Sequence, residues 1–326
     1  MSYIFCAPLV LCSKKKALTT MASVIVTGAT GLIGKALCKA LIERGDEVIV
    51  FSRDPGAARQ KVPGATAYVA WDGAEQGAWA ASIDGADAVV NLGAVSLFAR
   101  RWSDAFKREI RDNRVIGTRG IANAIAQAKS KPPVFVNASA VGIYGPHGHE
   151  KLDEDAPPGE GFLANVCKAW EAEARQAEAN TRVVLLRTGI VLDLHEGALQ
   201  QLMLPFKFGA GGPVLPGTQW ISWIHRDDEV GIILKALDDV TLSGPINATA
   251  PQPQTNAQFS RVLGEIMGRP AWVPVPGFAV RAAIGEAAET VTTGQYVVPA
   301  KALAHGYQFT FATSDVALRD LLGGQR

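Results

Sequence analysis

From residue 22 onward, short runs of apolar residues alternate with longer stretches whose apolar positions recur at helical spacing. The short runs are rich in valine and isoleucine, which is typical of strands buried on both faces. Strands are predicted from Val24 to a glycine-rich turn and over residues 47–51, 67–70, 86–92, 134–138 and 182–186. Helices are predicted after the turn, up to Gly45, and over residues 103–128 and 163–179. This alternation predicts an α/β fold with a doubly wound parallel sheet.

The pattern changes after Ile190. A loop is expected over residues 209–217, followed by a short strand at 220–224 and a helix at 229–237. Residues 244–250 resemble another strand, and 250–254 form a turn. From Asn256 on, short helical stretches alternate with prolines. We therefore expect a smaller, interleaved C-terminal lobe that covers the carboxyl edge of the sheet.

The turn after the first strand carries three glycines, Gly28, Gly31 and Gly34, in the spacing G-x-x-G-x-x-G. An amphipathic helix follows, with Leu32 and Ile33 at its start. Glycines let the backbone approach a pyrophosphate, and a helix start offers free N–H groups. A plain tight turn is the alternative. The flanking strand and helix favour a dinucleotide site, in a domain of residues 22–192 to which 220–248 return. Residues 193–219 and 249–326 then form the lobe.

The end of the second strand indicates which dinucleotide is bound. NAD-selective sites carry an acidic residue there, whereas this chain has Ser52 followed by Arg53. A hydroxyl and a guanidinium suit a 2′-phosphate, and Lys35 adds positive charge nearby. We expect NADP(H) rather than NAD(H). The alternative for Arg53 is an ordinary exposed arginine.

The composition of the chain limits the classes of partner and cofactor that it is expected to bind. The chain has 326 residues and a net charge of +1, with no basic excess for nucleic acid or an anionic membrane. Its four cysteines show no paired spacing, so a zinc site or a disulfide framework is not expected. Residues 1–21 are interpreted as a disordered leader or a start codon assigned too early. We expect a cytoplasmic protein, with a plastid or a mitochondrion as the alternative if this leader is a targeting remnant. A homodimer is left open.

Taken together, these motifs show that the chain resembles the extended short-chain dehydrogenase/reductase superfamily. The match rests on TGATGLIG (27–34), NLGA (91–94), NASAVGIYG (137–145), LRTGIVL (186–192) and WIHRDD (223–228). GPINATAP (244–251) and GRPAWVPVP (268–276) point to its atypical, SDR39U1-like epimerase-family subgroup. The resemblance implies NADP(H) contacts at Thr27, Gly28, Thr30, Gly31, Leu32, Ile33, Gly34, Ser52, Arg53, Asp72, Asn91, Leu92, Gly93, Ala94, Arg114, Arg187 and Thr188.

The catalytic residues of the superfamily are only partly present. Ser139 matches its serine, but the Tyr-x-x-x-Lys pair is missing. By register with Glu171, Leu163 stands in the tyrosine place and Cys167 in the lysine place. Leucine carries no exchangeable proton, so Cys167 or His225 is the candidate replacement acid.

Each of these candidates has a simpler interpretation. The simpler interpretation of Cys167, which we favour, is a small buried helix residue, and that of His225 is the partner of a local hydrogen bond to an aspartate. Tyr144 is read as a packing residue and Lys168 as solvent-exposed. His147 and His149 lie two apart in a glycine loop without a third ligand at a matching spacing, so no metal is expected.

Two classes of function remain. One is an NADP(H)-dependent oxidoreductase or epimerase that acts on a small carbonyl, alcohol or sugar-type substrate with Ser139 and a replacement acid. The other is a catalytically silent NADP(H)-binding regulatory protein, linked to organelle or cell division by the resemblance. The fold alone does not choose between them.

Overall fold

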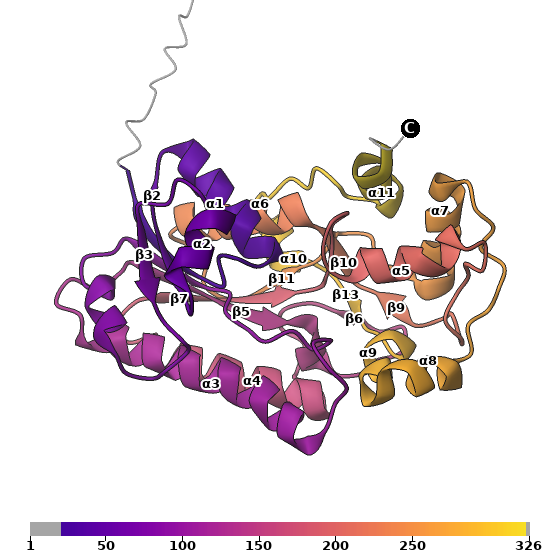
Figure 1. Cartoon of the computed structure of the whole chain (residues 1–326), viewed down its shortest axis with the longest axis horizontal. Helices are drawn as coiled ribbons and strands as arrows, with labels where there is room; N and C mark the ends of the chain where they lie inside the picture. Colours follow the sequence, from indigo (N-terminus) through magenta and orange to yellow (C-terminus); the bar gives the residue numbers. More distant parts are fainter. Residues whose placement is uncertain (1–20, 324–326) are drawn as a thin grey trace, which may run out of the picture.

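A computed structural model describes residues 21–323. Its centre is a sheet of seven parallel strands in the order β11-β7-β5-β4-β1-β2-β3 (Figure 1). These strands are β1 (Ser23–Thr27), β2 (Glu47–Ser52), β3 (Ala67–Ala70), β4 (Ala88–Asn91), β5 (Val134–Ala140), β7 (Arg182–Thr188) and β11 (Gly244–Ala248). The predicted doubly wound sheet is therefore confirmed. The direction of winding reverses between β1 and β4, which is where such sheets bind ligands.

Helices cover both faces of the sheet, so its strands are buried on each side. Figure 1 shows α1 and α6 on one face and α3 and α4 on the other. Their bounds, with those of the shorter helices α2, α10 and η1, are α1 (Leu32–Arg44), α2 (Pro55–Lys61), η1 (Ala78–Ile83), α3 (Asp104–Gln127), α4 (Phe162–Arg175), α6 (Arg226–Asp238) and α10 (Ala300–Ala304).

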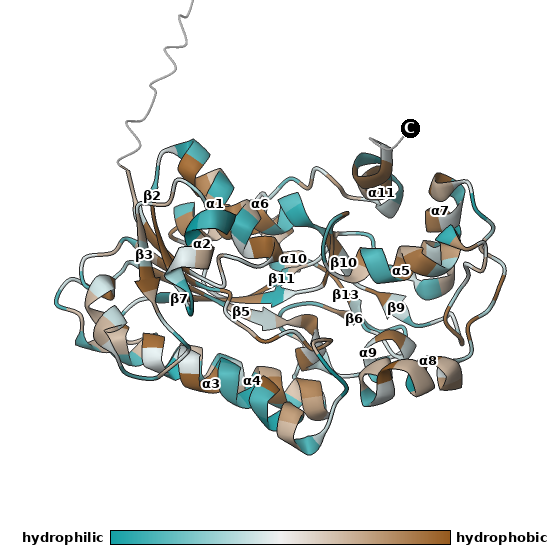
Figure 2. Cartoon of the chain, viewed as in Figure 1, coloured by the Kyte–Doolittle hydropathy of each residue, from teal (hydrophilic) through white to brown (hydrophobic). Residues whose placement is uncertain are grey.

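Alternation along β1 shows how one strand serves two cores. Val24 and Val26 pack with α1 and α6, whereas Ile25 packs with Phe135 on the opposite face. Because both faces are covered, the strand reads as an unbroken apolar run rather than as an alternating pattern. Figure 2 shows brown, hydrophobic strands near β2 and β3, next to helices that carry hydrophilic, teal segments.

The lobe is built from the late segments and has its own core. The helices α5, α7 and α11 surround the buried Trp223 and Phe259. The remaining elements are η2 (Val141–Tyr144), β6 (Lys151–Leu152), β8 (Ile190–Leu192), α5 (Ala198–Lys207), β9 (Trp220–Ile221), β10 (Trp223–His225), β12 (Gln254–Thr255), α7 (Asn256–Met267), α8 (Gly277–Ile284), η3 (Gly285–Ala288), α9 (Glu289–Thr292), β13 (Tyr296–Val297) and α11 (Ser314–Gly323).

The expected strand at 220–224 is two strands. β9 pairs antiparallel with β12, whereas β10 pairs parallel with β8, outside the seven-stranded sheet. Ser222 separates them because its Oγ donates to the carbonyl of Gln295 and accepts from the amide of Val297, which ties it to the lobe. Of residues 220–248, β11 is thus a strand of the central sheet and α6 packs on one of its faces, whereas β9 and β10 lie outside that sheet.

Two expectations concern the ends and the surroundings of the chain. The interpretation of the leader falls on residues 1–20, which lie outside the described residues, and on Met21. Within residues 21–323, no helix is both long enough and apolar enough to cross a lipid bilayer.

Candidate functional site

The glycine turn joins β1 to α1, and its backbone conformation requires glycine at two positions. Gly28 has a φ of +64°, and a Cβ there would lie 2.7 Å from the backbone of Leu92. A Cβ on Gly34 would lie 2.2 Å from the carbonyl oxygen of Gly28. Gly31 is the N-cap of α1, with no side-chain cap and no acidic residue in the first turn. The first N–H groups of α1 are therefore available to an anion, as a bound pyrophosphate requires.

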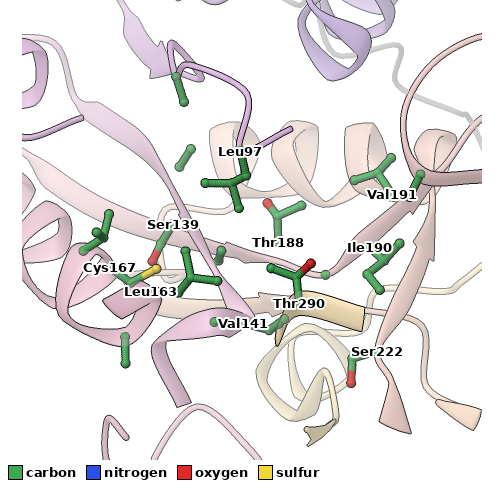
Figure 3. A pocket seen from close by; sticks show the side chains of 18 of the residues that line it. Leu97, Ser139, Val141, Leu163, Cys167, Thr188, Ile190, Val191, Ser222 and Thr290 are labelled. Atoms are coloured by element: carbon green, nitrogen blue, oxygen red, sulfur yellow. The ribbon is translucent and has the colours of Figure 1, made fainter. Parts of the chain in front are cut away.

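These glycines line a cleft of about 540 Å³ at the carboxyl edge of the sheet. This volume lies within the roughly 300–1,000 Å³ usual for small-molecule sites. Figure 3 shows Ser139 and Thr188 from neighbouring strands on its floor, and Ser222 and Thr290 from the lobe at its far wall. The sheet edge and the lobe thus enclose one continuous site.

The three positions of the incomplete catalytic set do meet in this cleft. Ser139, Leu163 and Cys167 all line it, and Figure 3 shows their side chains grouped together. Burial raises the pKa of Cys167 to about 12, and the charge of Glu171 adds to the rise, against opposing effects of Arg114, Ala140 and Ser139. Cys167 is therefore a neutral thiol at physiological pH.

Ser139 has a partner that the sequence analysis did not assign. Its Oγ lies 2.7 Å from Oε1 of Glu171 and donates a hydrogen bond to it, with both residues more than 95% buried. Because the single hydroxyl proton is engaged, Ser139 faces the cleft as an acceptor. A signal was available in the sequence, since Glu171 falls on the buried stripe of α4 with Cys167 and Trp170.

Glu171 is balanced by Arg187 behind the cleft. The Nε and Nη2 atoms of Arg187 lie 2.9 and 3.1 Å from the two carboxylate oxygens of Glu171. Burial favours a lower pKa for Arg187, but the hydrogen bonds and charge of Glu171 outweigh it and raise the pKa. The Tyr144 hydroxyl accepts from Arg187 and donates to Asn247, which makes Tyr144 a buried packing residue.

Arg114 is the only basic residue among the described residues that line the cleft. It is 9% exposed, and its guanidinium donates to the carbonyl oxygens of Ile110 and Val95 at 2.9 and 3.2 Å. The group also lies 5.1 Å from the centre of the Trp170 ring. Burial lowers the pKa of Arg114 to about 10, so the side chain stays charged at neutral pH.

The structure gathers some of the expected cofactor residues in the cleft and places others beside it. Those that line it are Gly28, Gly31, Leu32, Ile33, Gly34, Leu92, Ala94, Arg114 and Thr188. Those that do not are Thr27, Thr30, Ser52, Arg53, Asp72, Asn91, Gly93 and Arg187. Asn91, for example, is buried below the cleft, where its amide donates to Asn137 and its carbonyl accepts from Thr27. Asn91 therefore links the end of β1 to β5 and does not face a ligand.

Ser52, Arg53 and Asp72 lie beyond the cleft, at the ends of β2 and β3 next to the glycine turn. The Ser52 hydroxyl donates to the carbonyl of Asp54, and the side chain of Arg53 is exposed. Lys35 instead forms an ion pair with Glu196 on the other side of α1. The ammonium group of Lys35 is thus engaged by Glu196, whereas Arg53 is exposed after the end of β2.

His225 does not lie in the cleft, contrary to the expectation of a replacement acid. It is fully buried, its Nδ1 accepts from the amide of Asp227 at 3.1 Å, and its ring stacks on Phe311. Burial lowers its pKa, and nearby carboxylates oppose the change. His225 caps α6, which is why this helix begins before the predicted residue 229.

The remaining candidates have structural partners. Lys168 is exposed and donates to the carbonyl of Gly159. His149 accepts a hydrogen bond from the indole of Trp220. Within residues 21–323, no group of three or more His, Cys, Asp and Glu side chains has the arrangement of a metal site. The far wall, with Trp220, Glu289 and Thr290, was not predicted because its residues come from distant segments.

Comparisons with known proteins agree with this geometry. The model of the NAD dependent epimerase/dehydratase family matches residues 24–248, and that of a domain of unknown function, DUF1731, matches 275–321. The epimerase family protein SDR39U1 homolog, chloroplastic, of Arabidopsis thaliana is 39% identical over 96% of this chain and 90% of its own length. SDR39U1 of Homo sapiens is 37% identical over 92% and 99%.

Solved structures give the same result. The crystal structure of human SDR39U1 with NADPH has a TM-score of 0.84 and 37% identity, over 92% of this chain and 99% of that one. A nucleoside-diphosphate sugar epimerase from Corynebacterium glutamicum has a TM-score of 0.76 and 32% identity, over 94% and 59%. With its glycine turn and parallel sheet, the chain belongs to the NAD dependent epimerase/dehydratase family and resembles its SDR39U1 members.

Proposed function

We propose that this chain binds NADP(H) in the cleft and acts as an oxidoreductase or epimerase on a small carbonyl, alcohol or sugar-type substrate. The observation that carries the proposal is the uncapped start of α1 at Gly31, which opens into the cleft with no acidic residue in its first turn. The relative crystallised with NADPH supports the choice of cofactor.

The residues around the turn divide the cofactor between them. The amides at Leu32 and Ile33 receive the pyrophosphate, because free N–H groups at a helix start attract an anion. Arg53 receives the 2′-phosphate, with Ser52 beside it. Arg114 and Thr188 lie on the floor of the cleft, where the reactive end of the cofactor belongs. When bound, the nicotinamide donates or accepts a hydride.

Ser139 and Glu171 take over the work of the missing tyrosine. A substrate hydroxyl in the cleft donates to Ser139, because the proton of Ser139 already points to Glu171. As the substrate loses its proton to Ser139, the proton of Ser139 passes to Glu171, and the reverse order protonates a carbonyl. Arg187 holds the Glu171 carboxylate in place through hydrogen bonds to both of its oxygens.

A specific observation favours the second candidate, a catalytically silent NADP(H)-binding regulator. Leu163 offers no proton, and the thiol of Cys167 has a pKa of about 12. Such a protein would use the cofactor for stability or for sensing the redox state, with a role in organelle or cell division. For either function we propose a cytoplasmic location, with a plastid or mitochondrion as the alternative, and leave a homodimer open.

One experiment separates these candidates. NADPH binding is measured by calorimetry, and its oxidation is then followed by absorbance with a broad panel of carbonyl compounds. Turnover that is lost in Glu171→Gln, with NADPH affinity unchanged, supports the enzyme. Tight binding without turnover on the whole panel supports the regulator. Absence of NADPH binding contradicts both.

A further inference from the structure

The far end of the cleft contains a second helix start. α4 begins after Gly161, which has no side-chain cap, and residues 161–164 all line the cleft. An uncapped start of this kind ordinarily attracts an anion, and a phosphate group is the common ligand. The charged side chains near the N-terminus of α4 therefore decide whether a phosphate-bearing substrate can bind there.

A carboxylate of the lobe already stands there. Oε1 of Glu289 lies 4.0 Å from the point that a Cβ on Gly161 would occupy. Glu160 precedes the same N-cap, and both glutamates line the cleft. The positive end of the α4 dipole is thus met by the negative charge of the protein itself, and two carboxylates face any incoming anion.

Among the described residues that line this end of the cleft, none supplies a basic side chain to offset the two carboxylates. Arg114, the basic residue of the lining, lies on α3 and is engaged by backbone carbonyls and by Trp170. A neighbouring surface cleft shares Glu289 and Thr293 and adds Arg281 and Glu286, and Glu286 is paired with Lys107. Together, the charges of Arg281 and Lys107 balance those of Glu286 and Glu289, so a ligand that extends into this cleft meets no net positive charge. A diphosphate has no cationic partner among these residues.

The other lining residues at this end favour an apolar ligand. Val141, Leu163, Trp220 and Val291 contribute apolar surface. Figure 3 shows Thr290 near Val141, and the Thr290 hydroxyl donates to the carbonyl of Ala287, so its oxygen faces a ligand as an acceptor. This surface suits an uncharged molecule that carries one or two hydrogen-bonding groups.

We infer that the substrate is a small uncharged carbonyl or alcohol compound, and that Glu289, with Glu160, excludes nucleoside-diphosphate sugars. This inference rests on the proposed function, which assigns the glycine-turn end of the cleft to the cofactor. It separates this chain from the relative described as a nucleoside-diphosphate sugar epimerase. Glu289 is the specificity-determining residue.

The test measures binding and needs no turnover. NADPH is titrated first, and UDP-glucose is then titrated calorimetrically into the loaded chain. The variants are Glu289→Gln and Glu289→Lys, with Glu47→Lys as the matched control, because Glu47 is exposed at the opposite edge of the sheet. We expect no UDP-glucose binding by the unaltered chain or the control. Glu289→Lys should bind it at least about tenfold more tightly than Glu289→Gln, because an attractive charge replaces a neutral one.

Two results would overturn the inference. UDP-glucose binding by the unaltered chain as tight as NADPH binding removes the exclusion. Failure of both Glu289 variants to gain binding, while they bind NADPH normally, removes Glu289 as its cause. If NADPH itself does not bind, the proposed function fails, and the same UDP-glucose titrations on the cofactor-free chain still decide the role of Glu289.

Saturation-transfer NMR tests the uncharged ligand class directly. Cyclohexanone and cyclohexyl phosphate share a ring and differ in charge. We expect the NADPH-loaded chain to saturate the signals of the ketone and not those of the phosphate. Equal saturation of both, saturation of the phosphate alone, or saturation of neither contradicts the assignment.

Discussion

Ser139 and Glu171 form a buried hydrogen bond of 2.7 Å, in which the serine that lines the cleft gives its only proton to a carboxylate behind it. β5 contributes the serine and α4 the glutamate, so the contact ties a helix to the sheet. Since Arg187 from β7 completes the group, a single carboxylate serves both the site and the core.

The first prediction concerns the stability that Glu171 supplies. Glu171→Gln leaves the buried Arg187 without a charged partner, and breaking a buried pair in this way costs about 3–5 kcal/mol. The measurement is the free energy of unfolding in urea. Glu178→Gln is the control, because its pair with Arg175 is half exposed and such pairs contribute less than about 1 kcal/mol. Equal losses in both variants would show that Glu171 is not a buried anchor.

The second prediction concerns the thiol of Cys167. Its pKa of about 12 predicts very slow alkylation by iodoacetamide at pH 8, with a rate that rises as the pH approaches 12. The modified peptide is quantified by mass spectrometry in the folded chain and in urea, where the thiol regains its ordinary pKa. Cys167→Ala should retain any turnover. Rapid alkylation of the folded chain at pH 8 would contradict the buried, neutral thiol.

The third prediction separates binding from folding at the glycine turn. A Cβ on Gly31 would meet only the carbonyl of Gly28, at 3.4 Å. Gly31→Asp should therefore fold, since aspartate is a favoured N-cap. Its carboxylate repels the pyrophosphate, and we expect NADPH affinity to fall by about 100-fold or more.

The control for this variant is Gly148→Asp, which adds the same charge to an open loop outside the cleft. It should bind NADPH as the unaltered chain does. Calorimetry gives the affinities, and thermal unfolding shows whether Gly31→Asp is folded. Undiminished binding by a folded Gly31→Asp chain would place the cofactor elsewhere.

The fourth prediction concerns the choice between NADPH and NADH. Arg53→Ala removes the charge proposed to bind the 2′-phosphate, and a charge-assisted hydrogen bond contributes about 1.5–3 kcal/mol. The ratio of NADPH to NADH affinity should therefore fall by about 10- to 100-fold, mainly because NADPH binds more weakly while NADH binding changes little. Arg111→Ala, on the exposed face of α3, should leave it unchanged. An unaltered ratio in Arg53→Ala would refute the assignment.

The sequence predicted what depends on neighbouring residues. Buried parallel strands can be recognised as runs of apolar residues. The turn at Gly28 can be recognised because a positive φ and a close approach to the backbone of Leu92 need glycine. The grouping of Ser139 with Cys167 was implied by the resemblance to the superfamily, through the register with Glu171. The strands and the glycine turn, in contrast, could be predicted from the local chain alone.

Other parts of the site depend on contacts between distant segments. Glu289 reaches the cleft only because the lobe folds back onto α4, and no local pattern reveals that. His225 was one candidate acid, with a local hydrogen bond to an aspartate as the alternative, and in the structure its ring accepts from the backbone amide of Asp227 and caps α6. A local pattern therefore identified the cofactor turn better than the substrate end.

The last prediction is a pH dependence that comes from Glu229. This residue is fully buried, and its Oε1 accepts from Thr188, which lines the cleft. Burial raises the pKa of Glu229 to about 8, against an opposing effect of the Thr188 hydrogen bond. The folded chain thus keeps Glu229 protonated at neutral pH, while the unfolded chain ionises it near pH 4.5.

The sign follows from linkage. Because the pKa is higher in the folded state, the stabilisation is fully present below about pH 4.5, and it is lost as the pH rises to about 8 and changes no further above it. Over this window the free energy of unfolding should fall by a few kcal/mol, at about 1.4 kcal/mol for each unit of pKa shift. Glu229→Gln keeps the shape without the charge, so we expect it to flatten the profile and to be the more stable chain at pH 8. Urea unfolding at several pH values measures both profiles, and parallel profiles would show that Glu229 is ionised in the folded chain.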